Sequence, residues 1–199
     1  MDYNSRYLKK EFYWGMEPQG LVVESIKYLL PNAKVLDLGC GEGRDSFFLA
    51  KNGFKVAAVD ISEVGINKLK NFAKKERLSI ETTVSDVESF LDSCKNFNAI
   101  YCWNVLQFVS DDRIFSVINK IKAKTNSGGF NVIASFVAEN RKQKEKVLSK
   151  QGYYFDEGEL KELYKDWKII SYKEELGNLE THGEPEHRHF KVQMIAQKI

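Results

Sequence analysis

The sequence contains no apolar run approaching the roughly 20 residues that a membrane-spanning helix needs, and no Pro-, Gly- or Ser-rich linker. It has only three cysteines, Cys40, Cys94 and Cys102, and a scattered, odd set predicts reduced thiols instead of a disulfide framework. The first residues lack the basic-then-apolar order of a signal peptide. With 30 basic and 28 acidic residues, the net charge of +2 gives no overall attraction to nucleic acid or membranes. We therefore expect one cytoplasmic domain over residues 1–199.

The residues that are present alternate between strand-like and helix-like segments, and a hydrophobic content of 43% is sufficient for one core. The expected strands cover residues 34–38, 55–59, 79–84, 97–103 and 130–137. The expected helices cover residues 18–31, 44–51, 62–76 and 112–124. Because helices connect parallel strands by crossovers, this order predicts an α/β fold with helices on both faces of a mostly parallel sheet.

The alternation breaks after about Asp156. A helix over 157–166 precedes two extended segments, 167–174 and 189–196, and the absence of a helix between these segments predicts a closing antiparallel pair. Ligands of such sheets bind beyond the carboxyl ends of the strands, at the point where the strand order reverses. The expected divisions are an N-terminal region, a ligand-binding core and a closing helix with its hairpin: 1–31, 32–137 and 156–199.

A glycine loop, Gly39-x-Gly41-x-Gly43, separates the first expected strand from its helix. Glycines here permit a tight turn and close approach of the backbone to a nucleoside, although an ordinary strand-to-helix turn has the same composition. The dinucleotide-binding fingerprint requires G-x-G-x-x-G, and Arg44 occupies the place of its third glycine. The loop therefore argues against NAD.

Three acidic residues follow the pattern of strand ends. Asp37 lies two residues before Gly39, where an acid can bind a cationic amino group. Asp60 ends the second expected strand, where a carboxylate can accept both ribose hydroxyls. Asp86 follows the third strand and can accept from an adenine amine, cap the next helix, or do both. Together they predict a nucleoside ligand that also carries an amino group.

Residues 35–46, Val-Leu-Asp-Leu-Gly-Cys-Gly-Glu-Gly-Arg-Asp-Ser, resemble the S-adenosylmethionine (SAM) motif of class I methyltransferases. Gly43-Arg44-Asp45-Ser46, with Phe48-Leu49-Ala50 and Gly53, is similar to the tellurite-resistance methyltransferases and their relatives. The likeness extends along the chain to Gly158-Glu159-Leu160, Tyr164, Trp167 and Gly177-x-Leu179. It implies SAM as cofactor and a Rossmann-like class I methyltransferase fold, with seven strands of which the last is antiparallel.

The resemblance also implies which residues bind the cofactor. In relatives the segment around Trp14 folds over the cofactor, although Trp14 also suits a hydrophobic staple on the first helix. The other positions lie in the glycine loop and at the strand ends. The full expected set is Trp14, Asp37, Gly39, Cys40, Gly41, Arg44, Asp60, Ile61, Asp86, Val87, Trp103 and Asn104.

All three histidines, His182, His187 and His189, fall in one short segment with Arg188. The segment has three interpretations: a polar surface turn, an acceptor site with His187, Arg188 and His189 as catalytic candidates, or a metal site. Relatives place a His/Arg-bearing hairpin over the donor methyl, which favours the acceptor site, and we expect no metal. Glu180 and Thr181 follow Leu179 where the tellurite enzymes have a His-Arg pair, so tellurite is not assigned as substrate.

Signatures of nucleic-acid methylation are missing. No Asn/Asp-Pro-Pro-Tyr/Phe sequence follows the fourth expected strand, and neither Cys94 nor Cys102 follows a proline. The basic stretch 141–146 is interrupted by acid and is interpreted as a solvated helix face. We therefore expect methyl transfer to a small molecule, by in-line displacement with positioning and desolvation, in a monomer or homodimer without nucleic-acid or membrane partners. Methylation of a protein or peptide side chain and a non-catalytic SAM-binding module remain alternatives.

Overall fold

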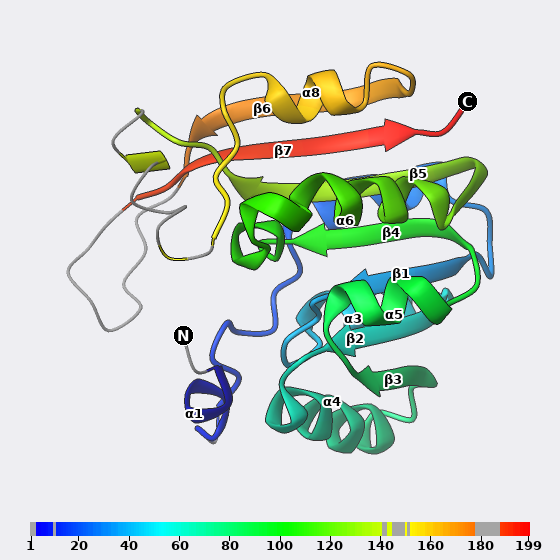
Figure 1. Ribbon diagram of the computed structural model, residues 1–199. Helices are drawn as coiled ribbons and strands as arrows, with labels where there is room; N and C mark the ends of the chain where they lie inside the picture. Colours follow the sequence, from blue (N-terminus) through cyan, green and yellow to red (C-terminus); the bar gives the residue numbers. More distant parts are fainter. Residues whose placement is uncertain (1–2, 10, 141–142, 145–149, 151, 178–187) are drawn as a thin grey trace.

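The computed structural model describes residues 3–9, 11–140, 143–144, 150, 152–177 and 188–199. One sheet of seven strands organises the chain, in the order β3-β2-β1-β4-β5-β7-β6 (Figure 1). The strands are β1 (Lys34–Leu38), β2 (Lys55–Asp60), β3 (Ile80–Val84), β4 (Phe97–Trp103), β5 (Thr125–Phe136), β6 (Lys168–Leu176) and β7 (Phe190–Gln197). Neighbouring strands from β3 to β5 pair in parallel, whereas β7 is antiparallel to both β5 and β6. The predicted α/β sheet with an antiparallel last strand is confirmed.

Helices cover both faces of this sheet, and α6 lies in front of β4 and β5 in Figure 1. The α-helices are α1 (Tyr3–Tyr7), α2 (Gly20–Ser25), α3 (Arg44–Lys51), α4 (Glu63–Lys75), α5 (Val87–Ser93), α6 (Asp111–Ala123) and α8 (Glu159–Leu163). Two short 3₁₀ turns are η1 (Ile26–Tyr28) and η2 (Leu106–Phe108). None of the helices in the described part of the chain is long and apolar enough to cross a membrane.

Alternate side chains of the central strands fill two separate cores. Leu36 and Ile100 pack into the core that includes α6, whereas Val35 and Ala99 pack into the core that includes α2 and α3. This follows from the two-residue period of a strand, which sends successive side chains to opposite faces. Both faces of β1 and β4 are buried, so the ends of these strands are the parts that can meet a ligand.

The predicted capping residues are confirmed. Ser62 Oγ accepts from Gly65 N at 3.0 Å, and Asp86 caps α5 through Glu88 N and Ser89 N. Gly53, just after α3, has the left-handed φ of +83° expected of a C-terminal glycine.

Some predicted boundaries are wrong. Strand β5 starts at Thr125, because Thr125 pairs with Phe97 before the register shifts, and the expected turn at 127–129 is an irregularity within the strand. Helix α8 begins at Glu159 because Gly158 before it is left-handed, and it ends at Leu163, three residues before the predicted end. The first expected helix, over 18–31, begins at Gly20 and tightens into η1. Helix α1 was not predicted.

A buried hydrogen-bond chain ties the region after α8 to β5. Tyr164 is fully buried and its hydroxyl donates to Asn131 Oδ1 at 2.9 Å. Asn131 Nδ2 donates to Thr125 Oγ1 at 2.8 Å, and Thr125 Oγ1 donates to the Ile121 carbonyl at 2.9 Å. Because these polar groups satisfy one another away from water, the chain stabilises the closing part of the sheet.

Replacing Tyr164 with Phe should lower the free energy of unfolding by about 1–3 kcal/mol, because Asn131 Oδ1 would be left buried without its donor. Urea unfolding followed by circular dichroism measures this change. The matched control is Tyr28→Phe, a half-buried tyrosine stacked on Phe130, which should change stability by less than about 0.5 kcal/mol. Equal effects of the two substitutions would contradict a structural role for the buried chain.

Candidate functional site

The glycine loop makes a left-handed turn at the carboxyl end of β1. Gly39, Gly41 and Gly43 have φ angles of +76°, +56° and +92°, which glycine adopts without the steric cost borne by other residues. Gly39 N and Cys40 N both donate to the Val59 carbonyl, at 2.7 and 2.9 Å. The loop is therefore folded back onto the end of β2, at the switch point between β1 and β4.

Neighbouring side chains press against each of these glycines. A Cβ added to Gly39 would overlap Val105 Cγ2, and one added to Gly41 would lie 2.8 Å from the Tyr7 hydroxyl. A Cβ on Gly43 would lie 2.6 Å from Leu69 Cδ1. The sequence interpretation attributed such close approach to a nucleoside. In the structure, side chains of the protein itself also require glycine at these three positions: Val105 after β4, Tyr7 in α1 and Leu69 in α4.

Sequence reasoning missed Gly65, whose position completes the packing of the loop. A Cβ on this residue would lie 2.7 Å from the Gly41 carbonyl oxygen, so α4 can approach the loop only with glycine at this place. The available signal was a glycine in the first turn of a helix, where it lowers helix stability.

Asp60 binds the loop directly. Its Oδ2 accepts from Gly41 N at 2.7 Å and its Oδ1 accepts from Ser62 N at 2.8 Å, while burial raises the pKa of the carboxyl. Each carboxylate oxygen can accept more than one hydrogen bond, so these contacts leave capacity for further donors. The neighbouring Ile61 is 72% exposed, an apolar side chain placed beside the polar loop.

Asp37 lies beneath the loop and is buried. It accepts from Ser46 Oγ at 2.5 Å, and burial together with the nearby Asp45 raises the pKa of its carboxyl to about 7. Asp45 is also buried and accepts from Gln19 N at 2.9 Å and from Arg44 Nη2 at 3.4 Å. Two buried carboxyl groups thus share one neighbouring guanidinium.

Arg44, expected at the cofactor, makes its contacts with protein groups. Its Nη1 donates to the Trp14 carbonyl at 3.4 Å, and in the amide orientation that suits both groups Gln19 accepts from Nη2 at 2.6 Å. The Trp14 ring packs edge-on against Tyr13, with ring centroids 4.8 Å apart. Arg44 therefore joins the loop to the N-terminal part of the chain.

Asp86 and Val87 lie after β3, at the same sheet edge. Both capping bonds of Asp86 use Oδ1, at 3.1 Å from Glu88 N and 3.0 Å from Ser89 N, and they lower the pKa of the carboxyl. Val87 is half-buried. The capping interpretation is confirmed.

The end of β4 carries an unsatisfied buried oxygen. Asn104 follows Trp103 with a left-handed φ of +53°, and its N donates to the Ala134 carbonyl at 2.9 Å. Asn104 Oδ1 is buried with no hydrogen-bond partner among the described residues. Gln107, which sequence reasoning did not identify, donates from Nε2 to the Asn104 carbonyl at 2.8 Å, and its own Oε1 is likewise unpaired within the described chain. Left-handed non-glycine residues and unpaired buried groups concentrate at functional sites.

The start of β7 reaches the same edge, beyond β4 and β5. His189 stacks on Phe136, with ring centroids 4.1 Å apart and planes at 12°, and Arg188 is exposed. His182 and His187 lie outside the described residues. Within the described part of the chain no three His, Cys, Asp or Glu residues are grouped to hold a metal, so the expectation on metal stays a prediction.

The parallel sheet, its antiparallel β7 and the glycine loop after β1 define the Rossmann-like methyltransferase class of folds. Residues 4–196 match the family described as tellurite resistance protein TehB, and the chain belongs to this family. The chain is 35% identical over 178 residues to the "Probable S-adenosyl-L-methionine-dependent methyltransferase TehB" of Haemophilus influenzae. That match covers 87% of this chain and 60% of the relative, so the chain spans less than two thirds of the relative's length.

Solved structures agree with this assignment. The crystal structure of TehB from Haemophilus influenzae superposes with a TM-score of 0.79 at 32% identity, covering 91% of this chain and 62% of that one. A magnesium protoporphyrin IX methyltransferase from Synechocystis PCC 6803 with bound SAH (S-adenosylhomocysteine) has a TM-score of 0.68 at 16% identity, covering 90% and 80%. At that identity the second comparison shows the fold alone.

Gly39→Ala should lower the free energy of unfolding by about 2–4 kcal/mol, because it adds an overlap with Val105 to the strain of a left-handed alanine. Gly53→Ala is the matched control, since its φ of +83° imposes similar strain while nothing lies within 4 Å of the added Cβ. Urea unfolding should show a cost of only about 1 kcal/mol for the control. Adding Val105→Ala to Gly39→Ala should recover part of the loss; no recovery would contradict the steric account.

Proposed function

We propose that this chain is a SAM-dependent methyltransferase that acts on a small-molecule acceptor. The observation that carries the proposal is a set of hydrogen-bond acceptors around the glycine loop: the Asp37, Asp60 and Asp86 carboxyl groups and the unpaired Asn104 Oδ1. SAM presents donors in a matching order, an α-ammonium group, two ribose hydroxyls and an adenine amine. Family membership and the name of the Haemophilus influenzae relative support the same cofactor.

The position of each group suggests how the cofactor is held. Asp60 would accept from the ribose hydroxyls while keeping its bonds to the loop, and Asp86 Oδ2 would accept from the adenine amine. The exposed Ile61 and the half-buried Val87 would supply apolar surface beside the adenine. Asp37, once ionised, would balance the charge of the methionyl ammonium group, and Asn104 Oδ1 would accept a hydrogen bond from it.

The chain's contribution to the reaction is positioning and exclusion of water. A bound sulfonium cofactor supplies an activated methyl group with a good leaving group, so the protein must chiefly align the acceptor and keep solvent out. Arg188 and His189 lie at the carboxyl edge of the sheet, beyond β5. We propose that they bind the acceptor, with His189 able to take a proton from an acceptor that carries one.

Calorimetry should show that the protein binds SAH and does not bind NAD. Asp60→Asn should weaken SAH binding by about 1–3 kcal/mol, because the ribose loses a charged acceptor. Asp166→Asn, which removes only an exposed carboxylate paired with Lys122, is the matched control and should leave SAH binding unchanged. Labelled SAM incubated with cell extract should then deliver its methyl group to the metabolite fraction.

The outcomes separate the parts of this proposal. No SAH binding by the folded protein would contradict the cofactor assignment. Unchanged affinity in Asp60→Asn would remove the ribose role. Label found only in the protein fraction would favour methylation of side chains, and binding without transfer to either fraction would favour a non-catalytic module.

SAH binding should strengthen as the pH rises from about 5 to about 8. The Asp37 carboxyl, with its pKa raised to about 7, is protonated at the low end, and the ligand's ammonium group favours the ionised form, so binding releases a proton. Asp37→Asn should flatten this pH dependence, as measured by calorimetry in buffers of different ionisation enthalpy. Without ligand, the raised pKa of Asp37 makes the free energy of unfolding decrease as the pH rises from about 4 to about 7. In this range the Asp37 carboxyl of the unfolded chain, which titrates near 4, loses its proton before that of the folded protein does.

A further inference from the structure

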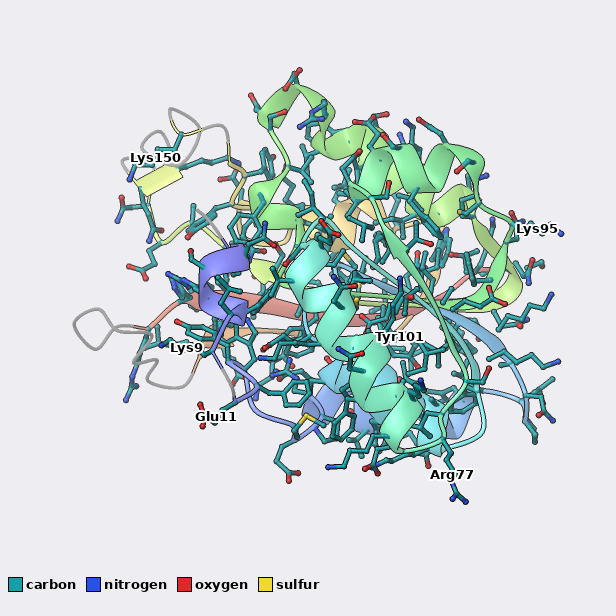
Figure 2. The ribbon with its side chains drawn as sticks, turned by 90° about the horizontal axis from the view of Figure 1, so that it is seen from below. Lys9, Glu11, Arg77, Lys95, Tyr101 and Lys150 are labelled. Carbon is teal, nitrogen blue, oxygen red and sulfur yellow. The ribbon has the colours of Figure 1, made fainter. Side chains whose placement is uncertain are left out.

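The part of the chain that covers the glycine loop has little regular structure of its own. We call residues 3–9 and 11–19 the N-terminal segment; its only helix, α1, is five residues long. Figure 2 shows α1 against α4, with Lys9 and Glu11 on the stretch that follows it. A five-residue helix is too short to be stable alone, so contacts with the core must hold the N-terminal segment in place.

Lys68, on α4, provides one of these contacts. Its ammonium group donates to the Lys9 carbonyl at 2.8 Å, to the Glu11 carbonyl at 2.8 Å and to Glu42 Oε1. A lysine has three N–H donors, and these three acceptors use all of them. The Nζ also lies 5.2 Å from the centre of the Phe12 ring. One side chain thus contacts three features of the N-terminal segment, the two carbonyls and the Phe12 ring, and also Glu42 outside it.

Glu42, in the glycine loop, completes the link. Its side chain is only 3% exposed, and while Oε1 pairs with Lys68, Oε2 accepts from Tyr13 N at 2.6 Å. Loss of Lys68 would leave the buried Glu42 charge without its counter-ion, which is costly in a protein interior. Both carboxylate oxygens bind protein groups, so Glu42 connects the loop to the N-terminal segment.

The residues held in this way lie directly over the loop. Tyr7 is a buried residue, 5% exposed, and its hydroxyl lies close to Gly41. The Trp14 carbonyl accepts a hydrogen bond from Arg44 at 3.4 Å. A ligand bound at the loop would have this segment as its cover. Release of the ligand would then require the segment to move, and that movement would break the contacts of Glu42 and Lys68.

We infer that Glu42 and Lys68 are positioning residues that hold the N-terminal segment over the bound cofactor and limit the rate at which it leaves. The inference rests on the proposed function for the identity of the ligand. It assigns two side chains that need not touch the cofactor to its retention, acting through the backbone of residues 9 and 11–13 and through Tyr7 and Trp14.

The test is the rate at which a fluorescently labelled SAH leaves the protein. Stopped-flow fluorescence measures this rate while excess unlabelled SAM displaces the labelled ligand. Lys68→Met keeps the aliphatic stem and removes the three donors, and it should speed dissociation about tenfold or more. Lys120→Met is the matched control, because it breaks ion pairs with Glu88 and Asp92 between α5 and α6, away from the segment. The control should dissociate at the wild-type rate.

Glu42→Gln is the milder second variant. Its amide oxygen can still accept from Tyr13 N, but the charge that pairs with Lys68 is gone, so dissociation should again accelerate. The double variant should be no faster than Lys68→Met alone, since both substitutions break the same link. Rates within twofold of wild type, equal acceleration in Lys120→Met, or multiplicative effects in the double variant would overturn the inference.

Limited trypsin digestion gives a readout that does not depend on the cofactor. Cleavage after Arg6 and Lys9 should be faster in folded Lys68→Met than in wild type or Lys120→Met. If wild-type protein bound no SAH, the proposed function would fail while this digestion still tested the anchorage. Unchanged cleavage together with unchanged SAH release would overturn the anchorage itself.

Discussion

The hydrogen bond from Gly41 N to Asp60 is the contact on which the site depends, because it fixes the end of β1 against the end of β2. This hydrogen bond closes a left-handed turn that glycine adopts without strain. The turn places the start of α3 beside Asp37, which accepts a hydrogen bond from Ser46. Strand ends, helix start and loop are thereby held within one small region. A cofactor with several separate donors needs such a preformed arrangement.

The loop serves two purposes through alternate positions. Its glycines admit Val105, Tyr7 and Leu69 to close packing, while the charged Glu42 between them and Arg44 after them bind other parts of the chain. Glu42 pairs with Lys68, and the Arg44 guanidinium offsets the neighbouring buried carboxyl groups. The motif therefore organises its own cover, which explains why a short N-terminal helix can persist there.

The closing half of the sheet extends the same edge beyond β5. Strand β7 inserts between β5 and β6 and runs against them, so its first residues stand beside the last residues of β5. The stacking of His189 on Phe136 is one result. The family match over residues 4–196 includes both this edge and the glycine loop.

The sequence by itself determined the succession of strands and helices along the chain, the bounds of β1, α3 and β4, the caps at Ser62 and Asp86, and the glycine loop with its acids. Each of these depends on local periodicity or turn chemistry. Only the tertiary structure decided α1, Gly65 and the link between Glu42 and Lys68. Lys68 binds backbone carbonyls, which every residue has, and Gly65 is required by a carbonyl 24 positions earlier in the chain. Such contacts leave no pattern in the sequence, since the partners meet only after the sheet has brought them together.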